Sequence, residues 1–98
     1  MIEIPLRSGA EYARHQFIVN VGDNQILIKQ EFLSYLDTPQ WIISIFRESL
    51  PVVLSKPLVP NVEITSQAKM NIGRIVFVGS EATLDNLGED NKLIWVYE

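Results

Sequence analysis

The side chains that could take part in catalysis or metal binding are mainly one histidine and the carboxylates of one acidic loop. His15 follows Arg14 at the start of a predicted strand, and the 98 residues include no cysteine and no second histidine. A histidine works in catalysis or metal binding only together with a nucleophile, a carboxylate or further ligands. Because no such partner stands at a recognisable spacing, we interpret His15 as an ordinary residue at a strand edge.

The acidic side chains gather before the C-terminal strand, as Glu81, Asp85, Glu89 and Asp90. Carboxylates can bind Ca²⁺, but this spacing lacks the alternating Asp/Asn order and the final Glu of an EF-hand loop. A glycosidase would need two carboxylates across a cleft, and the glycines stand singly rather than in a phosphate-binding loop. We therefore expect a solvated loop, and we expect no catalytic residue, no cofactor, no metal and no enzyme activity.

The composition indicates a small protein that buries part of its surface against partners. Ninety-eight residues suffice for one hydrophobic core, so we expect a single domain over residues 1–98. Only 20% of the residues are charged, whereas about 25% is usual for soluble domains. The net charge of −4 and the scattered basic residues argue against tight binding to a nucleic-acid backbone.

Targeting signals are not evident in the sequence. The start Met1-Ile2-Glu3-Ile4-Pro5 lacks the basic and apolar regions of a signal peptide, and no apolar run approaches the ~20 residues of a membrane span. The absence of cysteine is compatible with a reducing compartment. We expect a protein made in the cytoplasm, without a membrane anchor.

Short apolar runs separated by Gly, Pro and Asx turns predict about seven strands and no long helix. We place them at residues 2–6, 16–21, 25–35, 40–47, 50–54, 75–78 and 92–98. Gly22-Asp23-Asn24 predicts a hairpin turn between the second and third strands. The segment from Leu58 to Ile64 predicts an irregular crossing, because prolines interrupt it, and Gln67 to Asn71 predicts one helical turn. The fold class that follows is all-β, a compact sandwich or a partly closed barrel.

Three of these strands are apolar on both faces, which means that both of their sides are covered. They are residues 40–47, with Trp41 and Phe46 on opposite faces, residues 75–78, and residues 92–98, where the chain ends inside the strand. In the last strand we expect Leu93, Trp95 and Tyr97 to pack into the domain, while Ile94 and Val96 meet a second layer or a neighbouring subunit.

The order of several motifs resembles the small baseplate plug proteins of contractile-tailed bacteriophages, of the cyanophage type. The matching segments are Ile4-Pro5-Leu6, Pro57-Leu58-Val59-Pro60-Asn61-Val62, Leu84-Asp85-Asn86-Leu87-Gly88 and Leu93-Ile94-Trp95-Val96-Tyr97. The resemblance covers nearly the whole chain. The family usually has Gly at the position of Asn61 and more basic residues in the second hairpin than Lys29 and Arg47 provide.

The resemblance implies a structural protein of the virion tail baseplate, a hub plug that closes or lines the central channel at the distal end of the tail tube. It implies other hub, spike, tail tube or tape-measure proteins as partners, within a symmetric homo-oligomer. No specific binding to nucleic acid is implied. Combining this with the strand pattern, we expect partner contacts at Ile2, Trp41, Phe46, Ile94, Trp95 and Val96.

Two other functions stay open at this point. A peptide-binding β-module could capture an extended segment along its first or last strand. A small tail-associated hydrolase is the third possibility, disfavoured because no paired catalytic residues are evident.

Overall fold

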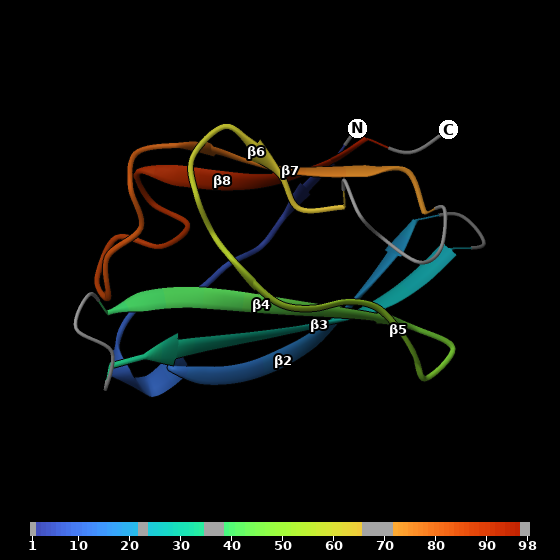
Figure 1. The fold of residues 1–98 in the computed structure, drawn as a ribbon, viewed down its shortest axis with the longest axis horizontal. Coiled ribbons are helices and arrows are strands. Elements are labelled where there is room, and N and C mark those ends of the chain that lie inside the picture. Colours follow the sequence, from blue (N-terminus) through green and yellow to red (C-terminus); the bar gives the residue numbers. More distant parts are fainter. Residues whose placement is uncertain (1, 22–23, 35–38, 66–71, 97–98) are drawn as a thin grey trace.

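The computed structural model describes residues 2–21, 24–34, 39–65 and 72–96, which form strands and one short 3₁₀ helix (Figure 1). The strands are β1 (Ile2–Ile4), β2 (Arg14–Val21), β3 (Asn24–Leu33), β4 (Gln40–Arg47), β5 (Leu50–Pro57), β6 (Val62–Glu63), β7 (Arg74–Gly79) and β8 (Asn91–Val96). The 3₁₀ helix η1 (Ala10–Tyr12) precedes β2. Among these residues no helix is long and apolar enough to cross a membrane.

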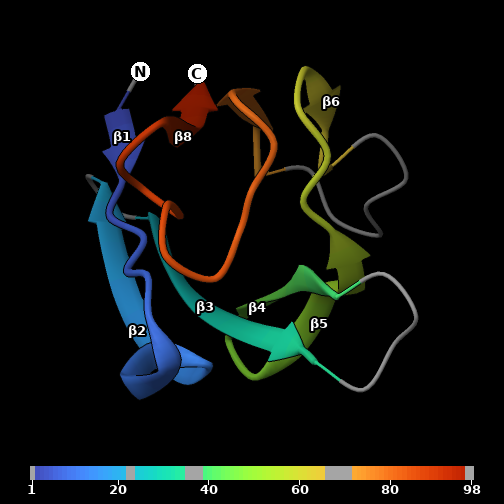
Figure 2. The same cartoon turned by 90° about the vertical axis from the view of Figure 1, so that its left-hand side faces the viewer.

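Two antiparallel sheets of four strands each make up the fold, in the orders β1-β8-β7-β6 and β2-β3-β4-β5. The sheets lie one above the other as two layers, and the chain crosses between them after β1 and after β5 (Figures 1 and 2). They do not close into a barrel, so of the two predicted architectures the sandwich is confirmed.

The space between the layers holds one hydrophobic core to which both sheets contribute. From one sheet come Ile4, Ile75, Phe77, Leu93 and Trp95, and from the other Val19, Ile26, Ile28, Trp41, Ile43, Ile45 and Val52. Side chains alternate between inside and outside along each strand, as the two-residue period of a β-strand requires. In β4 the buried positions are 41, 43 and 45.

The strand predictions agree well with the structure. The bounds of β4 are the predicted ones, β2 and β3 pair over eight registered positions, and β1 lies at a sheet edge. The crossing segment contains only the two-residue strand β6, while η1 was not predicted. Three predictions lie outside the described residues: the hairpin turn at Gly22 and Asp23, the helical turn from Gln67 to Asn71, and the packing of Tyr97.

The loop of residues 80–90 closes one end of the sandwich. The indole Nε1 of Trp41 donates a hydrogen bond of 2.8 Å to the backbone oxygen of Thr83, and Leu87 is buried. Gly88 has φ +83° and passes so close to Leu6 that a Cβ there would lie 2.6 Å from the Leu6 oxygen. The loop therefore packs onto the N-terminal segment, and glycine is needed at this position.

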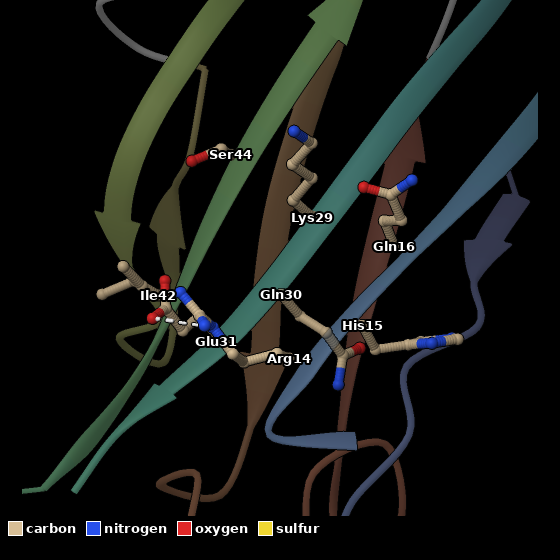
Figure 3. A pocket seen from close by; sticks show the side chains of 8 residues that line it. All are labelled: Arg14, His15, Gln16, Lys29, Gln30, Glu31, Ile42 and Ser44. Atoms are coloured by element: carbon tan, nitrogen blue, oxygen red, sulfur yellow. Dashed lines mark ion pairs between the residues drawn. The ribbon is translucent and has the colours of Figure 1, made fainter. Parts of the chain in front are cut away.

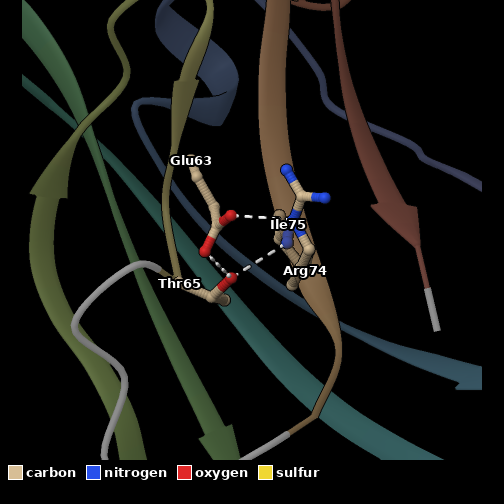
Figure 4. A network of polar contacts seen from close by, with 4 residues as sticks. All are labelled: Glu63, Thr65, Arg74 and Ile75. Carbon is tan, nitrogen blue, oxygen red and sulfur yellow. Dashed lines mark hydrogen bonds and ion pairs between the residues drawn. The ribbon is translucent and has the colours of Figure 1, made fainter. Parts of the chain in front are cut away.

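A polar network holds β6, the short edge strand of the β1-β8-β7-β6 sheet, in place (Figure 4). Arg74 Nε donates to Glu63 Oε1 at 2.8 Å, and the backbone N–H of Ile75 donates to Thr65 Oγ1 at 3.0 Å. These contacts supplement a strand pairing of only two residues. They hold the crossing segment against β7.

Candidate assembly surface

The outer face of the β2-β3-β4-β5 sheet is organised in rows of side chains that run across neighbouring strands. Strand register places Ile18, Leu27 and Phe46 side by side in one row, which we call the apolar row. The next row is Gln16, Lys29 and Ser44, and the third is Arg14, Glu31 and Ile42. The apolar row is therefore flanked by polar residues, since Asn20 and Gln25 pair on its other side.

The apolar row is accessible from outside. Ile18 keeps 58% of its surface exposed, and Leu27 and Phe46 are half-buried. The row borders an open hollow of about 400 Å³ that Gln25, Lys29, Glu48 and Ser49 also line. Lys29 Nζ lies 5.0 Å from the centroid of the Phe46 ring, so its charge covers one side of the ring. Apolar side chains that lie together on a surface are a candidate site for contact with another protein.

A second open hollow of about 400 Å³ lies over the polar rows (Figure 3). Arg14 and Glu31 point toward each other there, with Nε and Oε2 3.6 Å apart. The Arg14 side chain is 86% exposed, so this ion pair contributes little to stability. Five of the other six lining residues, all but Ile42, carry polar side chains.

The opposite sheet has its own, smaller apolar surface. Ile94 pairs with Val76 and Lys92 with Val78, so half-buried Ile94, Val76 and Val78 lie on the outer face of β7 and β8. Charged side chains frame them, among them the ion pair between Lys92 Nζ and Glu3 Oε1 at 3.7 Å. This face is apolar in the middle and charged at the rim.

The six predicted interface residues do not form one surface. Trp41 and Trp95 are 1% and 0% exposed and belong to the core. Phe46 lies on the outer face of one sheet and Ile94 and Val96 on that of the other, while Ile2 packs against the core at the edge strand β1. Trp41 and Trp95 have almost no exposed surface for a partner. Predicted partner contacts therefore remain at the four half-buried residues, Ile2, Phe46, Ile94 and Val96.

Ile18 and Leu27 lie on the surface but were not among the predicted interface residues. The signal was present in the second strand, since Phe17 and Val19 share its inner face and Ile18 must then point outward. The structure also corrects the alternative of strand addition along the last strand. β8 has β1 on one side and β7 on the other, so neither of its edges is free.

The residues first considered for chemistry serve in packing and loop structure. His15 stacks on Phe17 with ring centroids 5.4 Å apart and meets the edge of Tyr12 at 5.1 Å. In the acidic loop the amides of Asn86 and Asn91 make the hydrogen bonds, with Ser80, Glu81, Thr83 and Gly88. Within the described ranges no three His, Asp or Glu side chains are grouped as metal ligands.

Fold and surface together define a small antiparallel β-sandwich with an exposed apolar row of the kind that protein assembly buries. The family model described as cyanophage baseplate Pam3 plug gp18 matches residues 1–98, so the chain belongs to this family of baseplate plugs. Membership confirms the resemblance noted in the sequence and supports a structural role in the virion tail baseplate, in association with other tail components. A comparison with curated proteins finds no match.

Proposed function

We propose that this protein is a hub plug that closes or lines the central channel at the distal end of the tail tube. Its copies surround the tail axis as a symmetric homo-oligomer and contact hub, spike, tail tube or tape-measure proteins. It acts through binding and shape rather than catalysis. The protein is made in the host cytoplasm and enters the virion during tail assembly.

The apolar row is the observation that supports this proposal most strongly. Ile18, Leu27 and Phe46 lie in register on three strands, with Ile18 58% exposed. Permanent interfaces are more apolar than ordinary surface, because the hydrophobic contact persists for the lifetime of the assembly. A row of this kind suits a component that is covered by neighbouring subunits.

The charge of the chain suits a conduit for DNA. The net charge is −4, and the eight Lys and Arg residues are distributed along the sequence. Like charges repel over a Debye length of roughly 10 Å at moderate salt, so a channel lined by this protein would not retain the passing genome. Ion pairs at Arg14, Arg74 and Lys92 further reduce the basic charge available to phosphates.

Complementation of a phage whose plug gene is disrupted tests the proposal. The parent protein and Phe46→Lys, which introduces a charge into the apolar row, are supplied from a plasmid. Val59→Lys is the matched control, because Val59 is 45% exposed and lies outside the β2-β3-β4-β5 sheet. The measurements are plug content of purified tails, genome retention before adsorption and infectious titre.

We expect Phe46→Lys to fold but to enter tails poorly, and the resulting particles to lose their genome or tape-measure protein early. Val59→Lys should behave as the parent does. Particles that lack the plug yet retain and deliver their genome normally would contradict the proposed channel role. Normal incorporation of Phe46→Lys would contradict the role of the apolar row.

A further inference from the structure

Four of the described strands lie at sheet edges, and three of them are protected against pairing with another strand. β1 has three residues and is followed by Pro5, and β6 has two residues and is preceded by Pro60 and Asn61. β5 begins and ends near Pro51 and Pro57, pairs irregularly with β4 and has Ser55 at φ 51°. Short length, proline and bulges are the usual protection of a sheet edge.

β2 is the edge strand without such protection. It spans eight residues, contains no proline and keeps an unbroken register with β3 from Arg14 to Val21. Within the described part of the chain β3 is its only strand neighbour, so one side of its backbone has no ladder partner. Its outward side chains are Arg14, Gln16, Ile18 and Asn20, of which only one is charged. An exposed edge of this length is a template for strand addition.

We propose that β2 receives an extended segment of a neighbouring baseplate protein, which adds to the β2-β3-β4-β5 sheet as a fifth, antiparallel strand. The segment carries an apolar side chain opposite Ile18 and, four residues further toward its C-terminus, a carboxylate opposite Arg14. That the donor is a baseplate protein rests on the proposed function, whereas the receptivity of the edge does not.

The chemistry of the donor strand follows from the side chains that β2 presents. Ile18 is 58% exposed and gains from an apolar neighbour in the cross-strand position. The Arg14 side chain is 86% exposed, and its 3.6 Å contact with Glu31 leaves guanidinium donors available for a second carboxylate. β3 already shows this arrangement on the other side of β2, with Leu27 opposite Ile18 and Glu31 opposite Arg14.

A second copy of β2 fits this edge less well than another protein does. Residues 14–21 contain no Asp or Glu, so self-pairing leaves Arg14 without a carboxylate in any register. Antiparallel self-pairing places Ile18 opposite an apolar residue on the outer face only when the two copies of Ile18 face each other across the twofold axis. The occupant that satisfies both positions is therefore an acidic and apolar strand from a different chain.

A peptide with the sequence of residues 24–33 is the probe, because this segment carries Leu27 and Glu31 at the spacing that the proposed donor needs opposite Ile18 and Arg14. Isotope-labelled protein is titrated with this peptide at monomeric peptide concentrations, and chemical shifts and amide exchange are followed by NMR. Ile18→Lys places a charge on the edge. Leu54→Lys is the matched control on β5, because Leu54 is 57% exposed. The Arg14→Glu variant is titrated with a second peptide, in which Lys replaces the residue that corresponds to Glu31, to test whether reversing both charges restores binding.

We expect the peptide to slow amide exchange within residues 14–21. Ile18→Lys should weaken peptide binding about fivefold, while Leu54→Lys leaves it unchanged. The Lys peptide should bind Arg14→Glu more tightly than it binds the parent. Three results would overturn the proposal: no protection at residues 14–21, equal loss in both Lys variants, or protection of this edge by a second copy in the free protein. None of these would change the channel role, which the phage experiment tests separately.

Discussion

Trp41 and Thr83 are joined across 42 residues by a hydrogen bond of 2.8 Å from the indole Nε1 to the Thr83 backbone oxygen. The bond links the beginning of β4 in one sheet to the loop between β7 and β8 of the other sheet. It explains why a tryptophan, rather than a purely apolar side chain, occupies this core position. It also shows that the loop of residues 80–90 is part of the closed sandwich.

Trp41→Phe should lower the free energy of unfolding by about 2 kcal/mol, because it removes the hydrogen bond and leaves the Thr83 oxygen without its donor. Urea denaturation followed by circular dichroism measures the change. Thr83→Ala is the control, since the backbone oxygen is kept and the exposed side chain is not the acceptor; its effect should stay within about 0.5 kcal/mol. Equal losses in both variants would contradict this account of the bond.

Gln30 connects the sheet to the segment before β2. Its buried side-chain Nε2 donates to the backbone oxygens of Arg7 at 2.8 Å and Tyr12 at 3.1 Å. Gln30→Leu should therefore cost about 2 kcal/mol, because two backbone oxygens lose their donor. Exposed Gln25, which bonds only to the Asn20 side chain in the described structure, is the comparison, and Gln25→Ala should be nearly neutral. A stable Gln30→Leu variant would show that the segment needs no such link.

The loop of residues 80–90 should depend on its amides and not on its carboxylates. Asn91 is 2% exposed, accepts from the Gly88 N–H at 2.7 Å and donates to the Ser80 oxygen at 3.2 Å. Asn91→Ala should lower the free energy of unfolding by about 2 kcal/mol. Asp85→Asn and Asp90→Asn should leave the melting temperature unchanged with or without Ca²⁺. A calcium-dependent rise in the parent that these two variants lose would instead reveal a metal site.

Alanine substitutions at Gly88 and Gly9 can distinguish the cost of a steric clash from the cost of backbone strain. Both have positive φ, +83° and +95°, but a Cβ at Gly88 would lie 2.6 Å from the Leu6 oxygen, whereas nothing lies within 4 Å at Gly9. Gly9→Ala should cost about 1 kcal/mol for its conformation alone. Gly88→Ala should cost clearly more, since the loop must also move away from Leu6. Similar melting temperatures for the two variants would contradict the close contact.

The neighbours Trp95 and Ile94 test which face of β8 belongs to the core. Trp95 is 0% exposed and donates its indole N–H to the Ile72 oxygen at 2.7 Å, while Ile94 is half-buried on the outer face opposite Glu3. Trp95→Lys should unfold the protein or cost more than about 4 kcal/mol, because it buries an unpaired charge. Ile94→Lys should stay folded. Thermal melts that rank the two variants in the opposite order would reverse the assignment of faces.

Strand positions could be predicted from the sequence because they depend on local alternation and on turn residues. The bounds of β4 and the pairing of β2 with β3 are examples. Some strands are apolar on both faces, and the sequence pattern of such a strand is the same whether its own chain or a partner covers the second face. What covers that second face could therefore not be predicted. Trp41 is covered by a loop more than forty residues away, and such closure leaves no local signal.

The surface was harder to predict than the core for the same reason. Phe46 was named as an interface residue, but its neighbours Ile18 and Leu27 enter the row only through strand register. Register is a relation between strands, and the alternation within one strand does not contain it. The sequence pattern alone placed each residue on a face and did not show which residues share a row.

Reconstruction of the tail tip by electron cryomicroscopy, before and after contraction, tests the central claim most directly. The account predicts β-sandwich density of this chain on the tail axis at the distal end of the tube before contraction, with the apolar row of Ile18, Leu27 and Phe46 covered by a neighbouring subunit. After contraction the channel should be open. Density of this chain at the periphery of the baseplate, or an open axial channel before contraction, would contradict the account.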